Sequence, residues 1–317
     1  MLPGSPKMGA FLVCTAAVMW GFDGVVLTPR LYNLEVSYVV FMLHLLPFIG
    51  MQFLLRGAYA EARTLDRGQW GYFFLIALFG GALGTLFIVK ALFLVNFKHL
   101  TVVALLQKLQ PIFAIILARL LLGERIERRF VFWAALAIGA GYFLTFQLHL
   151  PVFSGVDTML PAAAYSLLAA FCFGSATVFG KGVLKRVSFQ TALFLRYGLT
   201  TLIMLGIVLF RGSISQIAAT TPLNWTFLVL IGLTTGSGAI LLYYYGLRFV
   251  RAGVATICEL CFPVSAVLFD YLFNNHLISP LQWASAAVML YAIYQISRRQ
   301  DARGAGDEPA SGLCETT

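Results

Sequence analysis

Two long apolar stretches of the chain each carry an ionisable residue just before a proline. Lys108 precedes Pro111 by three positions, and Glu259 precedes Pro263 by four. Residues at these spacings share one face of a helix. A proline inside a helix frees the carbonyl four residues earlier, and a freed carbonyl can serve a polar cavity. The two pairs therefore predict two helix breaks, each beside a charge.

A cavity at these breaks would have a basic side and an acidic side. Gln107 and Gln110 flank Lys108, and Lys90 lies in the preceding apolar stretch. The two lysines could hold a carboxylate or phosphate, whereas Glu259 could bind an amine or carry a coupling proton. The alternative is internal ion pairing of Lys108 with an acid, in which case removal of one partner would damage folding rather than transport.

Further polar and aromatic residues lie at bilayer depth. An ionisable group there costs at least about 2.5–3.5 kcal/mol, so each one needs a role. Asp23 could bind substrate or pair with Lys108, and Arg196 could bind substrate, carbonyls or lipid headgroups. Aromatic residues could line the cavity or simply pack helices. The expected substrate-binding residues are Trp20, Asp23, Lys90, Gln107, Lys108, Gln110, Arg196, Tyr244 and Glu259.

Composition places the chain among membrane proteins. Of its 317 residues, 60% are hydrophobic and 11% charged, whereas a soluble domain carries about 25% charged residues. The net charge of +9 does not indicate nucleic acid, because the basic residues lie between apolar runs. No P-loop, nucleophile elbow or HExxH occurs, so we expect no enzyme, no ATPase, no metal and no cofactor.

Ten apolar runs have lengths suited to membrane helices, which need roughly 20 residues, whereas a barrel strand needs only about 10. The sequence therefore predicts an all-α integral membrane protein with ten transmembrane helices. The runs are 8–28, 36–55, 70–95, 100–121, 130–148, 159–181, 189–210, 223–247, 253–273 and 281–297.

The distribution of Lys and Arg orients these helices. One set of loops and termini carries 14 basic residues, and the opposite set carries only Arg30, Lys98 and Arg211. The positive-inside rule then places both termini in the cytoplasm, with the chain in the inner membrane of a cell. The polar residues 298–317 are expected to form a disordered cytoplasmic tail.

An internal repeat divides the chain. Pro111 and Pro263 are 152 residues apart, and other features recur in the same order near that offset. These are WGFD (20–23) with FGSA (173–176), His44 with Arg196, GT (84–85) with GS (236–237), and LLGERI (121–126) with FNNHLI (273–278). The pattern predicts two five-helix repeats, residues 8–148 and 159–297. Because five is odd, the second repeat must be inverted, as in secondary transporters.

The chain resembles the drug/metabolite transporter superfamily, EamA-type, over about residues 8–297. The motifs are WG (20–21), LLGERI after the proline of the fourth run, and GLRFVRAGVATICELCFP (246–263). It departs from the family pattern at Asn274–His276, where LGE stands in the first half, and at His44, where the family often has Arg. The resemblance implies a central cavity lined by spans 1–4 and 6–9, with spans 5 and 10 peripheral.

We therefore expect a secondary active transporter, a permease or exporter of a small metabolite, working by alternating access. Amino acid-like and anionic solutes both fit the charges named above. The expected partners are the transported solute and the lipid bilayer, and no nucleic acid is expected. The sequence is compatible with both a monomer and a homodimer. The alternatives are a non-transporting helical membrane subunit or assembly factor, and an intramembrane enzyme, for which no convincing nucleophile or metal set occurs.

Overall fold

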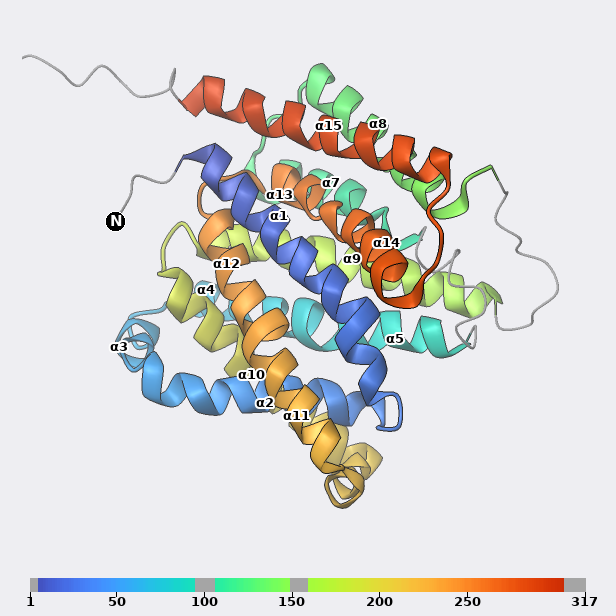
Figure 1. The fold of residues 1–317 in the computed structure, drawn as a ribbon. Helices are drawn as coiled ribbons and strands as arrows, with labels where there is room; N and C mark the ends of the chain where they lie inside the picture. The colour runs from blue at the N-terminus through green and yellow to red at the C-terminus, as the bar shows by residue number, and fades with distance from the viewer. Residues whose placement is uncertain (1–4, 95–105, 149–158, 305–317) are drawn as a thin grey trace, which may run out of the picture.

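The computed structural model describes residues 5–94, 106–148 and 159–304, and every regular element in those ranges is helical (Figure 1). In the first half these are α1 (Pro6–Phe22), η1 (Asp23–Leu27), η2 (Thr28–Leu31), α2 (Val36–Leu54), α3 (Gly57–Ala62), α4 (Arg67–Leu75), η3 (Ile76–Leu83), α5 (Gly84–Leu94), α7 (Gln110–Leu122) and α8 (Arg128–Phe146). In the second half they are α9 (Met159–Val183), α10 (Phe189–Arg211), η4 (Ser213–Ala219), α11 (Pro222–Ile231), η5 (Gly232–Gly236), α12 (Ser237–Leu247), α13 (Ala252–Cys258), α14 (Cys261–Asn274) and α15 (Pro280–Gly304).

Eight helical segments within the described ranges are long and apolar enough to cross a bilayer. The other two predicted spans fall short for different reasons. α7 has only 13 residues after its break, and residues 100–105 of that run lie outside the described part. α15 carries Gln282, Tyr291 and Gln295 among its apolar residues. The described chain is thus an all-helical integral membrane protein, whereas ten spans in two inverted repeats remain a prediction.

The C-terminal helix is longer than predicted. α15 continues to Gly304, so the prediction of disorder is wrong for residues 298–304. The segment SRRQDAR (297–303) consists mostly of good helix formers and contains no proline, so nothing ends the helix where the apolar run ends. Residues 305–317 of the predicted tail lie outside the described residues.

The helices that carry Pro111 and Pro263 are both interrupted just before the proline. α13 ends at Cys258, and the Phe262 N–H then donates to the Glu259 carbonyl at 2.9 Å, three residues back. In the first half, the Ile112 N–H donates to the Leu109 carbonyl at 2.9 Å in the same way. These tighter turns replace the bonds that each proline cannot make. The polar side chains beside each break therefore lie in the middle of a predicted span.

Three further interruptions are π-helical. They are η1, η3 and η5, and each joins two α-helical or 3-10 segments of one span. A π-turn widens the helix and re-aims its side chains, and such turns occur often at functional sites. Asp23 begins η1, and Gly80 lies in η3.

Helices of the two predicted halves pack on each other rather than forming separate bundles. α1 packs on both α12 and α14, α2 on α10, and α5 on α9 (Figure 1). α8 and α15 pair along one edge of the molecule. Where α1 crosses α12, a Cβ added to Gly246 would lie 2.7 Å from the Gly9 carbonyl oxygen, so only glycine permits this approach. Both halves therefore contribute side chains to a shared interior.

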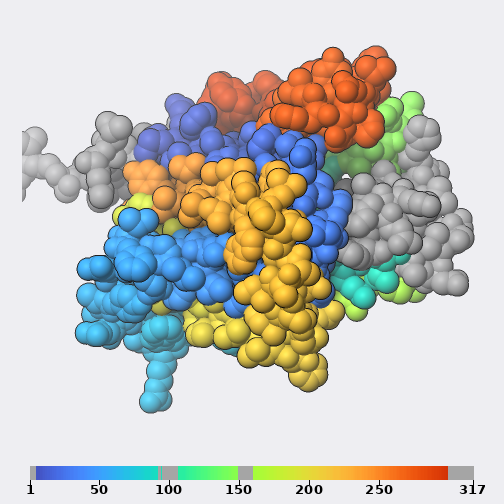
Figure 2. Space-filling model, turned by 60° about the horizontal axis from the view of Figure 1, so that its bottom comes forward, coloured from blue at the N-terminus to red at the C-terminus, as the bar shows by residue number. Residues whose placement is uncertain are grey.

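Large apolar side chains cover the outside. Figure 2 shows the segment from η4 to α12, coloured gold, as a ridge across one face. On this segment Leu223 is 61% exposed and Leu233 is 57% exposed. A surface of this kind would be unfavourable in water, and it suits contact with lipid chains.

Candidate substrate-binding site

The carboxylate of Glu259 joins helices from both halves of the chain. It lies at the break between α13 and α14 and is half-buried. Its Oε1 accepts from the Tyr243 hydroxyl of α12 at 2.7 Å and from Thr177 Oγ1 of α9 at 3.3 Å. Its Oε2 accepts from Gln110 Nε2 of α7 at 2.7 Å. Three neutral donors thus hold this carboxylate, and we call these four residues the Glu259 cluster.

An aromatic wall adjoins the Glu259 cluster. The rings of Trp20 and Tyr243 have centroids 5.5 Å apart, and those of Tyr243 and Tyr244 are 6.0 Å apart. Tyr243 and Tyr244 are buried, whereas Trp20 is half-buried. These three residues come from α1 and α12, whose close crossing brings them together. An apolar wall beside a few convergent polar groups is the usual composition of a small-molecule site.

Arg196 supplies the cation of this region. Its Nη1 donates to the Tyr244 hydroxyl at 3.3 Å, and its Nη2 donates to the Gly80 carbonyl at 3.1 Å. A Cβ on Gly80 would lie 2.7 Å from the Ala176 Cβ and 3.3 Å from Nη2, so a side chain there would clash with α9 and crowd the guanidinium. No direct ion pair joins Arg196 and Glu259 in the described part of the chain. Tyr244 connects the guanidinium to the aromatic wall, which in turn adjoins the cluster.

Asp23 lies apart from this hydrogen-bond network. Its Oδ1 accepts from Thr28 Oγ1 at 2.8 Å, within the π and 3-10 turns at the end of the first span. His44 of α2, which the repeat aligns with Arg196, donates from Nδ1 to the Val40 carbonyl at 2.8 Å and lies beside the Tyr197 ring. Neither residue forms a described contact with Lys108.

The predicted basic side of the cavity is absent from this cluster. Lys108 is buried and turns toward α8, where its Nζ donates to the Gly141 carbonyl at 3.0 Å and to the Thr145 hydroxyl. No ion pair in the described chain includes it, so the alternative of pairing with Glu259 or Asp23 is wrong for this conformation. Lys90 is exposed on α5. Gln107 is half-buried and makes no described hydrogen bond to the cluster.

Thr177 was missed by the sequence analysis. It follows directly on FGSA (173–176), the second-half counterpart of WGFD (20–23). The repeat itself therefore contained a signal for this position. A threonine in an apolar helix usually bonds its own backbone four residues earlier, which is why its type alone gives no such signal.

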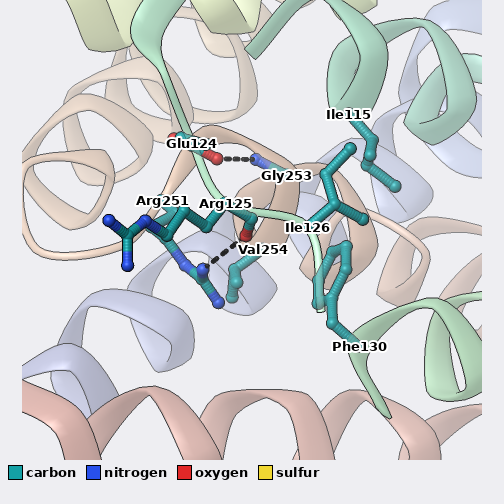
Figure 3. A pocket seen from close by; sticks show the side chains of 8 residues that line it. All are labelled: Ile115, Glu124, Arg125, Ile126, Phe130, Arg251, Gly253 and Val254. Atoms are coloured by element: carbon teal, nitrogen blue, oxygen red, sulfur yellow. Dashed lines mark hydrogen bonds between the residues drawn. The ribbon is translucent and has the colours of Figure 1, made fainter. Parts of the chain in front are cut away.

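At the end of the bundle predicted to face the cytoplasm, the LLGERI motif closes the interface between the halves (Figure 3). The Glu124 carboxylate accepts from the backbone N–H groups of Ala252 at 2.7 Å and Gly253 at 3.3 Å, at the start of α13. The Arg251 guanidinium donates to the Arg125 carbonyl at 3.1 Å. The adjoining cavity of about 10 Å³ has room for about one water, so it is too small for a metabolite.

The opposite end of the bundle is joined by different contacts. The side-chain amides of Asn33 and Asn224 bond each other reciprocally at 3.0 Å. Arg211 forms an ion pair with Glu35 at 3.2 Å. Burial alone would raise the pKa of the Glu35 carboxyl, but hydrogen bonds from Ser37, Tyr38 and Ser213, together with the charge of Arg211, bring it below its usual value. Both ends of the inter-half interface are thus bonded.

Comparisons with known proteins identify the family to which this chain belongs. The EamA-like transporter family matches residues 7–146 and again residues 160–298. The riboflavin transporter ImpX of Fusobacterium nucleatum subsp. nucleatum (strain ATCC 23726 / VPI 4351) is 60% identical over 291 residues, which cover 92% of this chain and 97% of that protein. A solved structure, described only as the crystal structure of a protein, has a TM-score of 0.69 at 16% identity and covers 93% of this chain and 98% of its own; that likeness concerns the fold alone. The chain belongs to the EamA-like transporter family, and it is a multi-pass membrane transporter rather than an enzyme.

Proposed function

We propose that this chain is a secondary transporter of riboflavin. The observation that carries the proposal is the aromatic wall of Trp20, Tyr243 and Tyr244 beside the Glu259 cluster. Riboflavin is a flat uncharged ring system with a polar edge and a polyhydroxyl chain, and it suits a site that is aromatic on one side and hydrogen-bonding on the other. The riboflavin transporter of Fusobacterium nucleatum, at 60% identity, supports the same substrate.

This substrate replaces the anionic and amino acid-like solutes expected from the lysines. Those solutes required Lys90 and Lys108 to face the cavity, whereas Lys90 is exposed and Lys108 bonds α8. An uncharged ring needs no such basic pair. The remaining charges near the site, Arg196 and Glu259, are hydrogen-bonded to neutral partners and can donate to and accept from a neutral ligand.

Transport by alternating access is part of the proposal. Two proline breaks and three π-turns interrupt the spans that carry the site residues or contact them. Such breaks let helix halves move about a fixed site, as in transporters built from inverted repeats. Ten spans, both termini in the cytoplasm and residence in the inner membrane belong to the same proposal. Because the chain has no ATPase motif, the energy for transport would come from an ion or solute gradient or from exchange of solutes.

Counterflow in liposomes tests the transport function. The purified protein is reconstituted with unlabelled riboflavin inside, and entry of labelled riboflavin is followed. Trp20→Ala should reduce the initial rate at least about tenfold, because it removes one face of the aromatic wall. Trp283→Ala is the matched control, since that side chain lies on α15 and is 54% exposed. Entry no faster than into protein-free liposomes would refute the function and would favour a non-transporting membrane subunit.

A further inference from the structure

The site region contains hydrogen-bonding groups that no described residue satisfies. The Nε–H of Arg196 is buried and has no acceptor among the described residues. Gln110 uses one amide N–H on Glu259, and no bond in the described chain occupies its carbonyl oxygen or its second N–H. A buried donor without a partner costs about 1–3 kcal/mol, so such a group calls for a ligand. Arg196 lies on α10 and reaches this region through the Tyr244 hydroxyl, whereas Gln110 lies on α7 and bonds Glu259 directly.

The Glu259 carboxylate itself keeps one acceptor position. A carboxylate offers about four lone-pair sites, and three are taken by Tyr243, Thr177 and Gln110. The region therefore presents a free donor from Arg196, a free acceptor from Glu259 or Gln110, and a free donor from Gln110.

The pyrimidine edge of the flavin ring carries the complementary set of groups, two acceptors and one donor. Its C2 carbonyl accepts, its N3–H donates and its C4 carbonyl accepts. We infer that Arg196, Glu259 and Gln110 recognise this edge of riboflavin, and that they determine its selection over flavins altered at N3. The inference rests on the proposed function, since it names the part of riboflavin that the same site would bind.

The aromatic wall accounts for the rest of the ring in this arrangement. Trp20 and Tyr243 adjoin each other at 5.5 Å, and the Tyr243 hydroxyl reaches Glu259. A flat ring packed on Trp20 or Tyr243, whose ring planes are inclined by 47°, would therefore lie beside the cluster. The ribityl chain, on the central ring, would not carry the recognition. A site built on hydrogen bonds rejects an analogue that lacks them, because its own buried groups then stay unpaired.

The experiment compares three ligands on the unmodified purified chain by quenching of flavin fluorescence. Riboflavin is the reference, 3-methylriboflavin replaces the N3–H by a methyl group, and lumiflavin lacks the ribityl chain. We expect 3-methylriboflavin to bind at least about tenfold more weakly, because it cannot donate and its methyl group displaces the edge. Lumiflavin should bind within about threefold of riboflavin. Because no variant is required, a folding defect cannot obscure the result.

Two glutamine variants localise the effect. Gln110→Ala should weaken riboflavin about tenfold and should not weaken 3-methylriboflavin further, because the contact is already lost. Gln107→Ala is the matched control, since Gln107 flanks the same lysine without a described bond to the cluster, and it should change neither affinity.

The outcomes separate this inference from the proposed function. If riboflavin and 3-methylriboflavin bind equally, the transporter function stands and the edge recognition is refuted. If lumiflavin loses as much affinity relative to riboflavin as 3-methylriboflavin does, the ribityl chain carries the recognition instead, and the inference is also refuted. If riboflavin does not bind at all, the proposed function itself fails.

Discussion

Lys108 is a buried lysine whose amino group is held by uncharged oxygens. Its Nζ donates to the Gly141 carbonyl and the Thr145 hydroxyl of α8, so it ties the turn before α7 to that helix. Several such bonds can satisfy an ammonium group in an apolar interior without an acid. This arrangement assigns Lys108 to the stability of the bundle rather than to the substrate.

At the residue scale, Lys108→Ala should therefore destabilise the protein without changing the site. We expect a loss of about 2 kcal/mol, from the hydrogen bonds to a charged group and the packing removed together. The riboflavin dissociation constant should change less than about twofold. Thermal melts and fluorescence titration measure the two quantities, and Lys90→Ala on an exposed position is the control. A variant as stable as the wild type that fails to bind would return Lys108 to the substrate site.

Individual site residues are also the feature that the sequence predicts least well. The types and spacing of Glu259, Gln110, Arg196 and Trp20 marked them as candidates, and the structure gathers these four in one region. The same reasoning named Lys90 and Lys108, which lie elsewhere. A sequence gives the depth of a charge in a helix but not the rotation of the helix that carries it, and rotation depends on packing against neighbours.

At the scale of elements, glycines decide how closely helices cross. A Cβ on Gly246 would lie 2.7 Å from the Gly9 carbonyl oxygen and 3.0 Å from the Leu12 Cβ, in a contact between α12 and α1. Gly206 of α10 has nothing within 4 Å of the same position. The two glycines therefore offer a matched pair of substitutions, one in a tight crossing and one in open space.

Gly246→Ala should destabilise the chain by about 1–3 kcal/mol, because backbone must separate to admit the methyl group. Gly206→Ala should leave stability unchanged or raise it by up to about 1 kcal/mol, since alanine is the better helix former. Melting temperatures of the two purified variants measure the difference. Equal melting temperatures would mean that the crossing of α1 and α12 is looser than described here.

Elements differ in how far the sequence specifies them. The two prolines predicted interruptions, and both helices are interrupted just before them. The π-turns η1, η3 and η5 carry no comparable residue signal, since glycine and apolar residues also suit an ordinary helix. The C-terminal helix passed its predicted end because hydropathy marks where a membrane span ends, not where helical hydrogen bonding ends.

At the scale of the whole molecule, the two halves are joined at both ends. Glu124 caps α13 at the end predicted to be cytoplasmic, and the amides of Asn33 and Asn224 meet at the other. Composition and repeats predicted the class of protein, and the family matches each half separately. They could not predict these contacts, because each one joins residues 128 or 191 positions apart that meet only after packing. Alternating access requires each joint to open in turn.

Closing the Asn33–Asn224 joint covalently should therefore stop transport. In the Asn33→Cys, Asn224→Cys double variant, a short bifunctional methanethiosulfonate reagent should link the two thiols, since two side chains whose amides bond at 3.0 Å place their Cβ atoms too far apart for a direct disulfide. Riboflavin counterflow should fall at least about tenfold on cross-linking and return on addition of reductant. Each single cysteine variant treated with the same reagent is the control, and the described native cysteines are free and buried or half-buried. If the cross-linked protein transports at the full rate, this end of the bundle does not open during transport, and substrate must pass by a route that leaves the two halves fixed there.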